Sequence, residues 1–435
     1  MTLAAVGVLL SRLPWIAAGY GSDPDSYRVV GTARVIARAG IYEASRLPGY
    51  PAYEYLTALT VAGPPWVSNL VTALLSTGAF ILFALILVQL RIRRYLLLAL
   101  GFALVPVIYL NSCNTIDYVP ALTAMLAASY ATLRGRPVLA GVSLGLAIGC
   151  RITSGALVLP LGLWVLLSLP RPAAVRFMVV SGFSALLTGA LCFMPVLRVY
   201  GLGFFTFYDN DSLPPWDVVF TRAVPLVWGP LGAAALAAAI AALLCRPRQV
   251  RAALRDPLAR NALGVCLLAI ALYVSAFLRL PDEAGYLVPV VPWVLIAVAM
   301  LLPSPLVTAL AIALMLSPWS ELIEDHRVRE SQQQQTQAII KAVQALPGTA
   351  VIVSGWVLPR LTLALDGDRI GAHRFVYLID DQGDYAHYLA EGRQIYYLPG
   401  VDLYESQAHQ LELAEMGAHP LAVPRERQRP ASTGE

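Results

Sequence analysis

Residues 21–56 have the sequence GSDPDSYRVVGTARVIARAGIYEASRLPGYPAYEYL and stand between the first two apolar runs of the chain. This segment concentrates ionisable side chains, namely Asp23, Asp25, Arg28, Arg46 and Glu54, together with several tyrosines. Ionisable groups beside a bilayer are costly to bury, so such a cluster indicates a functional site. The remainder of the chain determines which side of a membrane the segment faces.

The composition is that of a membrane protein. The chain has 435 residues, of which 58% are hydrophobic and only 13% are charged. These values exclude an ordinary soluble enzyme and favour a polytopic membrane protein. The five cysteines lie within apolar segments without metal-ligand spacing or a disulfide framework, and they are expected to be packing residues. The net charge of +4 is small, and no nucleic-acid partner is expected.

The apolar runs predict about eleven transmembrane helices. Their ranges are 2–19, 66–89, 95–111, 118–133, 137–151, 153–169, 177–199, 223–245, 261–279, 285–302 and 304–320. The short pair around Arg151 is predicted to be half-helices that stop at a water-filled cavity. The first run could instead be a cleaved signal peptide. A retained span is favoured, because Arg12 interrupts the apolar core and no basic residue precedes it.

Arginine-rich loops indicate the orientation in the membrane. Four such loops, at residues 91–94, 134–136, 171–176 and 246–260, fall on one side of the predicted spans. The positive-inside rule makes that side cytoplasmic, so the chain after about Glu321 lies outside. Of the acidic residues before that point, all except Asp256 map to the outer side. The sequence predicts a multi-pass protein of the plasma membrane with an outward-facing site.

The chain changes character after about residue 320. A polar, glutamine-rich helix precedes the strand-like runs TAVIVSGW, HRFVYLID and RQIYYLPG, with a short helical stretch between the last two and an amphipathic helix at about 404–416. Alternating short strands and helices predict a small α/β domain with a parallel sheet. The predicted domains are therefore a transmembrane domain at 1–320 with an outer loop at 20–65, an extracytoplasmic α/β domain at 321–424, and a disordered tail at 425–435.

Residues 25–38 have helical periodicity and predict an amphipathic helix in the membrane interface. Asp23 and Asp25 flank Pro24 just before it. Carboxylates suit the N-terminus of a helix, so capping is the simplest alternative to a functional role. The two acids, the nearby Arg28 and the following SRLPGYP stretch favour a site.

A second candidate region lies at the outer ends of the fourth and fifth predicted spans. Asp117 stands in NTIDYVP at the start of one helix, where an acidic residue is common. Arg151 follows Gly141, Gly145 and Gly149, which repeat every four residues and predict close helix packing. An unpaired guanidinium is costly in that position, so a phosphate or a carboxylate such as Asp117 is expected beside Arg151.

Two other outer segments carry polar and aromatic residues. RLPDEAGY places Asp282, Glu283 and Tyr286 at the outer rim. The loop 201–222 is equally consistent with a lid over the site and with an aromatic membrane-interface belt. The five histidines show no metal-ligand spacing, so a zinc site is not expected.

In these motifs the chain resembles the GT-C glycosyltransferases, in particular the protein O-mannosyltransferases and the lipid A aminoarabinose transferases. The resemblance rests on DPDSYR after the first span, SRLPGYP after an amphipathic segment, NTIDY after the third span, and GLAIGCRITS. It covers roughly residues 1–300 and none of the C-terminal domain. Asp25 matches the family's acidic position better than Asp23. Ser26 stands where the protein mannosyltransferases have the Glu of an Asp-Glu pair, which makes a protein acceptor doubtful.

The resemblance implies an inverting transferase that moves a sugar from a polyprenyl-phosphate donor to a lipid, glycan or protein acceptor on the outer face. A sugar on a lipid phosphate already has a good leaving group, so one base is sufficient to take the acceptor proton. Asp25 is the expected base, with Asp23 and Asp117 as further catalytic candidates. Arg46, Arg151 and Arg28 are expected to bind the donor phosphate.

The remaining implied contacts concern the substrate and a metal. Tyr27, Tyr50, Asp282, Glu283 and Tyr286 are the candidate substrate-binding residues. The resemblance assigns no cofactor to every member of the family. A divalent cation, Mg²⁺ or Mn²⁺, held by Asp25 and Asp117 is an option because some members of the family use one and others do not.

A transporter or flippase of lipid-linked sugars is the alternative of a different class. It would use the same outer charged cavity but needs polar residues near the middle of the membrane. Apart from Arg12, the centres of the predicted spans carry almost no charge, which favours an enzyme with its site at the rim.

Overall fold

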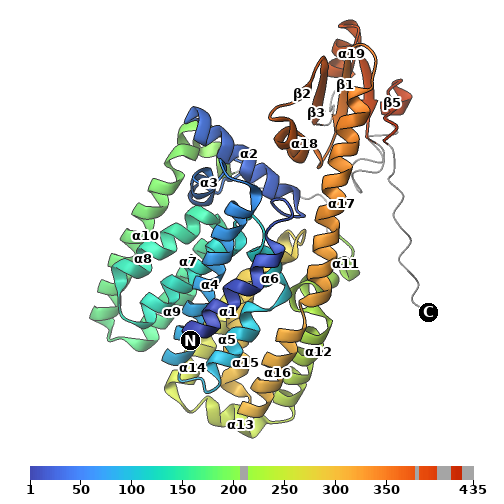
Figure 1. The fold of residues 1–435 in the computed structure, drawn as a ribbon. Helices are drawn as coiled ribbons and strands as arrows, with labels where there is room; N and C mark the ends of the chain where they lie inside the picture. The colour runs from blue at the N-terminus through green and yellow to red at the C-terminus, as the bar shows by residue number, and fades with distance from the viewer. Residues whose placement is uncertain (206–213, 378–381, 399–412, 424–435) are drawn as a thin grey trace, which may run out of the picture. The chain divides into compact units, whose positions relative to one another are not determined.

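The structure is a computed structural model that describes residues 1–205, 214–377, 382–398 and 413–423 (Figure 1). The chain divides into two compact units. The membrane unit comprises Met1–Gly21 and Thr32–His326, and the C-terminal unit comprises Ser22–Gly31 and Arg327–Glu435. Two of the three boundaries fall within helices, α2 (Pro24–Ala39) and α17 (Trp319–Gln344), and the third lies just before α2. The start of the predicted outer loop 20–65 thus groups with the C-terminal unit, and the tail 425–435 lies outside the described residues.

The membrane unit is helical, and many of its helices begin at a proline, a residue that suits the first helical turn because its missing N–H has no partner there. Its helices are α1 (Thr2–Arg12), α3 (Pro51–Ala58), α4 (Pro65–Gln89), α5 (Tyr95–Ala103), α6 (Pro106–Ser112), α7 (Tyr118–Leu133), α8 (Pro137–Cys150), α9 (Val158–Ser168), α10 (Arg171–Tyr200), α11 (Trp216–Ala223), α12 (Pro225–Leu244), α13 (Pro247–Ala253), α14 (Pro257–Arg279), α15 (Val291–Leu301) and α16 (Ser304–Leu316).

Every predicted span corresponds to an apolar helix, but the number of full spans is smaller than expected. Among the described residues, six helices are long and apolar enough to cross a membrane, and a seventh is formed if α5 and α6, bent by 62°, count as one span. The other four predicted spans are apolar helices of 10–17 residues. Because a bilayer needs about 20 helical residues, the count of about eleven is not confirmed. Apolar runs locate helices without fixing where each helix bends or ends.

The glycine pattern of α8 has the predicted packing role. A Cβ added to Gly145 would lie 2.6 Å from Cβ of Thr188, and one added to Gly149 would lie 2.7 Å from Cβ of Cys192, both on α10. These approaches are too close for any side chain, so the glycines allow α8 and α10 to pack backbone against backbone. The interruption predicted near Arg151 is also present, since α8 ends at Cys150 and Arg151 has an extended backbone.

The buried charge of α1 is satisfied inside the membrane unit. Arg12 is fully buried, and its guanidinium donates to Oγ of Ser112 at 3.2 Å and to the carbonyl of Ala103 at 2.5 Å. The Tyr109 ring lies 4.4 Å from its Cζ atom. Neutral acceptors and an aromatic ring therefore solvate this cation, which serves to join α1 to its neighbours.

The C-terminal unit contains the predicted α/β domain. Its strands are β1 (Ala350–Ser354), β2 (Arg369–Ile370), β3 (His373–Tyr377), β4 (Gln394–Tyr397) and β5 (His419–Pro420), and its described helices include α18 (Leu358–Leu365) and α19 (Gln382–Ala390). The sheet has the order β2-β3-β1-β4-β5. All pairings are parallel except the antiparallel β2–β3 pair.

The three strands predicted from sequence are β1, β3 and β4, and the predicted polar helix is the later part of α17. Ile339 and Val343 of α17 pack with Ile352 of β1 and Phe375 of β3 in one apolar core. The two-residue strands β2 and β5 were too short to give a sequence signal. The amphipathic helix expected at about 404–416 falls largely outside the described residues.

Candidate functional site

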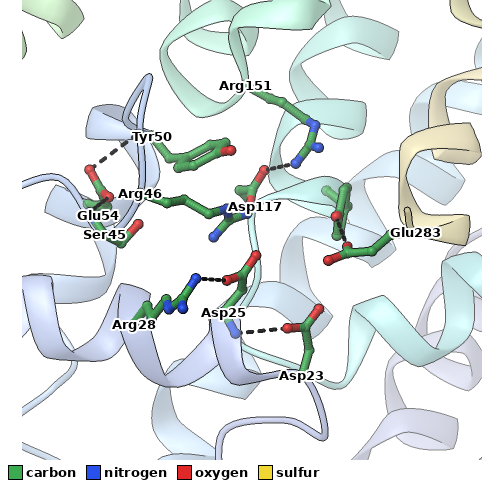
Figure 2. A network of polar contacts seen from close by, with 11 residues as sticks. Asp23, Asp25, Arg28, Ser45, Arg46, Tyr50, Glu54, Asp117, Arg151 and Glu283 are labelled. Carbon is green, nitrogen blue, oxygen red and sulfur yellow. Dashed lines mark hydrogen bonds and ion pairs between the residues drawn. The ribbon is translucent and has the colours of Figure 1, made fainter. Parts of the chain in front are cut away.

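The centre of the candidate site in the membrane unit is a buried carboxylate shared by two arginines (Figure 2). Nη2 of Arg46 lies 2.8 Å from Oδ1 of Asp117, and Nη1 of Arg151 lies 2.6 Å from Oδ2 of the same residue. The Asp117 side chain is fully buried, and those of Arg46 and Arg151 are 9% and 11% exposed. The predicted Arg151–Asp117 pair is therefore confirmed, and Arg46 joins it.

Local backbone structure explains why these three side chains meet. Asp117 occupies the N-cap position of α7, yet its side chain makes no capping hydrogen bond and is directed to the arginines instead. Arg151 is the first residue after α8, the helix that the glycines hold against α10. Arg46 comes from the loop that precedes α3. Asp117 thus stands at the helix start, where acidic residues are common, without capping the helix through its side chain.

Aromatic rings surround the two guanidinium groups. The Tyr50 ring centroid is 4.1 Å from Cζ of Arg46. The rings of Tyr118 and Tyr286 lie 4.3 Å and 4.9 Å from Cζ of Arg151. Cation–π contact stabilises a buried guanidinium without neutralising it. Two of the tyrosines proposed as substrate contacts, Tyr50 and Tyr286, therefore also hold the arginines in place.

A second buried carboxylate organises the loop that carries Arg46. Glu54 accepts hydrogen bonds from the Tyr42 hydroxyl at 2.5 Å, from the Ser45 amide at 2.9 Å and from the Tyr50 amide at 3.3 Å. Its side chain is fully buried, and this burial raises the pKa of the Glu54 carboxyl above its ordinary value despite the hydrogen bonds that lower it. Glu54 therefore fixes the SRLPGYP segment from α3.

The Asp282–Glu283 segment contributes one further contact beside Arg151. The Tyr118 hydroxyl donates to the Glu283 carboxylate. A Cβ added to Gly285 would lie 2.6 Å from the Tyr118 ring, so only glycine fits there. Asp282 lies farther out, with Nη1 of Arg222 at 3.9 Å from its carboxylate and 42% of its side chain exposed.

The C-terminal unit carries the remaining candidates, from the start of α2. The Asp25 amide donates to Oδ1 of Asp23 at 2.8 Å, and Nη1 of Arg28 lies 3.3 Å from Oδ1 of Asp25 (Figure 2). Arg28 also stacks on Trp356, with Cζ at 4.5 Å from the ring centroid. The Gln332 side chain donates to the carbonyl of Ser22 at 2.8 Å. Asp23 thus caps the helix, while the Asp25 carboxylate pairs with the guanidinium group of Arg28 in the same helix.

Tyr27 is buried in the same short segment, with 7% of its surface exposed. Helical periodicity places Tyr27, Val30, Ala33 and Ala37 on one face; Val30 and Ala33 are fully buried, whereas Ala37 is exposed. The geometry gives Tyr27 a packing role, and its predicted contact with a substrate stays a prediction.

The surroundings of Asp117 do not fit a divalent cation. Both of its oxygens already face guanidinium groups at hydrogen-bonding distance, and two adjacent cations disfavour a third. A metal role for Asp25 stays a prediction.

Sequence reasoning missed three contributions to this arrangement. The sequence marks Glu54 only as one charge of the outer loop, gives Tyr118 no distinguishing pattern, and places Trp356 in a domain without any recognised motif. A buried tyrosine directly after Asp117 and an acid four residues after Tyr50 were the available signals for the first two. Nothing in the sequence connects Trp356 with Arg28.

No protein-family model and no curated protein matches this sequence. Solved structures do match. A crystal structure of ArnT from Cupriavidus metallidurans bound to undecaprenyl phosphate aligns with a TM-score of 0.64 and 16% sequence identity, covering 98% of this chain and 96% of that chain. The apo structure of the same protein aligns with a TM-score of 0.58 and 15% identity, covering 91% and 88%.

This chain has the ArnT fold. The resemblance to GT-C transferases of the aminoarabinose type is thereby confirmed for the fold, and the apolar helices together with the ArnT fold indicate a multi-pass membrane protein. The match with ArnT extends over the C-terminal part of the chain, which the sequence motifs did not cover.

Proposed function

We propose that this protein is an inverting membrane glycosyltransferase that uses a polyprenyl-phosphate-linked sugar as its donor. The observation that carries the proposal is the pair of buried arginines, Arg46 and Arg151, positioned on one carboxylate among tyrosine rings. The ArnT structure of the same fold contains undecaprenyl phosphate, which supports a lipid phosphate as the ligand class.

Arg151 has the chemistry that a leaving phosphate requires. One of its N–H donors is used by Asp117, and the planar guanidinium has further donors that suit a phosphate. In the proposed reaction the bond between the anomeric carbon and the phosphate oxygen breaks, and negative charge develops on the phosphate. Pre-positioned cations in a site of low dielectric stabilise that charge without reorganising.

Asp25 is the proposed general base. The acceptor hydroxyl forms the new bond to the anomeric carbon from the face opposite the phosphate, so the configuration inverts, and its proton passes to the Asp25 carboxylate. Arg28, with Nη1 3.3 Å from Oδ1 of Asp25, orients that carboxylate, while Asp23 accepts a hydrogen bond from the Asp25 amide and holds the turn. Glu283 and Tyr286, with Asp282 at the exposed rim, are the proposed sugar or acceptor contacts.

The transporter alternative receives no specific support. It needs an unsatisfied polar group at mid-membrane, and the one buried charge identified there from sequence, Arg12, is bound by neutral acceptors. We propose a lipid or glycan acceptor in preference to a protein acceptor. The reason is that Ser26 follows Asp25, at the position where the protein mannosyltransferases have the Glu of an Asp-Glu pair.

A transfer assay tests the proposal. Purified protein is incubated with radiolabelled polyprenyl-phosphate sugars and a membrane lipid extract, and the product that carries the label is identified. Transfer of label to a component of the extract, with release of free polyprenyl phosphate, is expected. Movement of intact donor across a vesicle bilayer without any transfer would instead support the transporter alternative.

We also propose that the site and the C-terminal unit face the outside of the plasma membrane, on the basis of the arginine-rich loops. The test fuses a reporter enzyme after residue 435. A reporter that works only after export is expected to be active there. Activity of a cytoplasm-only reporter at the same position would contradict both the orientation and an extracytoplasmic site.

A further inference from the structure

A separate cavity of about 230 Å³ lies in the membrane unit, away from the residues of the candidate site. It is formed by the turn between α4 and α5, the starts of α14 and α16, and the end of α15. Three arginines of the turn line it, Arg91, Arg93 and Arg94. The positive-inside rule places this turn at the cytoplasmic surface.

The cavity has an uncompensated positive charge. All three arginines are exposed, and none of their guanidinium groups makes a hydrogen bond or ion pair with another residue in the part of the chain that the structure describes. The one acidic residue in the lining is Asp256, and its Oδ1 already accepts the Leu258 amide at 3.1 Å to cap α14. Three cations thus face a space with one partly engaged anion.

The backbone of the turn also indicates that these side chains matter. Arg91 and Arg94 have positive φ values of 57° and 39°, in the left-handed region that glycine adopts without strain. A turn selected for its shape alone would favour glycine at both positions. We therefore expect the arginine side chains to make a favourable interaction whose free energy offsets the backbone strain.

The opposite wall of the cavity is apolar. Met300 and Leu302 from the end of α15 and Val307 of α16 line it, beside Leu90 and Ile92 of the turn. A site with a cationic mouth and an apolar wall between membrane helices suits an amphiphile whose anionic head is joined to a hydrocarbon tail. A free anion in water would have no use for the apolar side.

We propose that this cavity binds the phosphate headgroup of an anionic membrane phospholipid, with its acyl chains along the neighbouring helices. The three guanidinium groups contact the phosphodiester, and the lipid joins the α4–α5 turn to α14 and α16. This proposal does not depend on the enzymatic one, since none of its residues belongs to the candidate catalytic site.

Lipid-dependent thermal stability tests the proposal. Full-length protein in neutral detergent is titrated with phosphatidylglycerol, with phosphatidylcholine, or with inorganic phosphate, and the shift in melting temperature gives an apparent Kd. Stabilisation by phosphatidylglycerol alone is expected. The combined variant Arg91→Gln, Arg93→Gln and Arg94→Gln should bind about a hundredfold more weakly, because each arginine near an anionic lipid contributes roughly fivefold.

A matched control and a milder variant keep the test decisive. Neutralising Arg134, Arg136 and Arg171, which are exposed on other loops of the same predicted side, should leave the affinity near that of the wild type. If the triple cavity variant fails to fold, Arg93→Gln alone should still weaken binding about fivefold. Equal stabilisation of the wild type and a cavity variant would overturn the proposal. An equal effect of inorganic phosphate or of phosphatidylcholine would overturn the assignment to an anionic lipid.

Discussion

Arg151 donates from Nη1 to Oδ2 of Asp117 at 2.6 Å, although the two residues flank different helices. The contact joins the start of α7 to the end of α8 in the interior of the membrane unit. Because Asp117 also binds Arg46, it holds two cations in fixed positions instead of acting as a free carboxylate. Asp117 is better described as the anchor of the arginine pair than as a base.

Substitution of Arg151 separates phosphate binding from a purely structural role. Arg151→Lys conserves the charge but loses the planar, two-pronged donor, so affinity for undecaprenyl phosphate should fall. Arg151→Ala should weaken it by about ten- to a hundredfold, the range for a lost hydrogen bond to a charged group. The measurement is the thermal stabilisation of each variant by undecaprenyl phosphate. If the lipid stabilises Arg151→Ala as much as the wild type, Arg151 does not bind phosphate.

A Cβ at residue 285 should disturb the aromatic surroundings of Arg151. Gly285→Ala would place a methyl group 2.6 Å from the Tyr118 ring, which must move and loosen its contact with Arg151. We expect a loss of stability of about 1–3 kcal/mol and weaker binding of undecaprenyl phosphate. Gly264→Ala is the control, because its added Cβ meets nothing within 4 Å. Similar behaviour of the two alanine variants would show that Tyr118 is not held as described.

The sequence predicted the helices, the parallel strands and the Arg151–Asp117 pair, each for a local reason. Apolar length, alternating strands and a guanidinium at a helix end all leave signals within a short window of sequence. Helix bends and helix ends leave no such signal, and so the bend between α5 and α6 and the short lengths of α7 and α8 are not predicted and the count of about eleven spans is not confirmed. Bends depend on packing partners that are distant in the sequence.

The contacts between distant residues were correspondingly hard to predict. Arg46 reaches Asp117 from a loop that Glu54 holds by hydrogen bonds, and Arg28 reaches Trp356 within the C-terminal unit, with which Ser22–Gly31 groups. A single sequence specifies the residue types at such sites but not which ones meet.

The raised pKa of Glu54 predicts a pH dependence of stability. Its folded-state pKa lies above the ordinary value of 4.5, so its stabilising contribution is complete below that pH and is lost as the pH rises through the folded-state value. Glu54→Gln removes this titration. Melting temperatures of both proteins across acidic to neutral pH should therefore show the wild type losing stability relative to the variant as the pH rises. A relative gain with rising pH would contradict the burial argument.

The stacking of Arg28 on Trp356 predicts an influence of the C-terminal unit on the proposed base. Trp356→Ala removes a contact of about 0.5–1 kcal/mol and should lower the transfer rate two- to fivefold by loosening Arg28 and hence Asp25. Trp356→Phe retains an aromatic face and should preserve most of the rate. Comparison of kcat with donor KM distinguishes this from general damage, since only kcat should fall. A matching rise in donor KM would place the effect elsewhere.

The most direct test of the account is the rate of sugar transfer by Asp25→Asn. The substitution keeps the size of the side chain and removes its ability to accept a proton. We predict that transfer from a radiolabelled polyprenyl-phosphate sugar falls by about two to four orders of magnitude, the usual contribution of a general base, while stabilisation by undecaprenyl phosphate is unchanged. Near-normal transfer by Asp25→Asn would contradict the assignment of Asp25 as the base. If Asp23→Asn and Asp117→Asn also transferred sugar at near-normal rates, the enzymatic account itself would be contradicted.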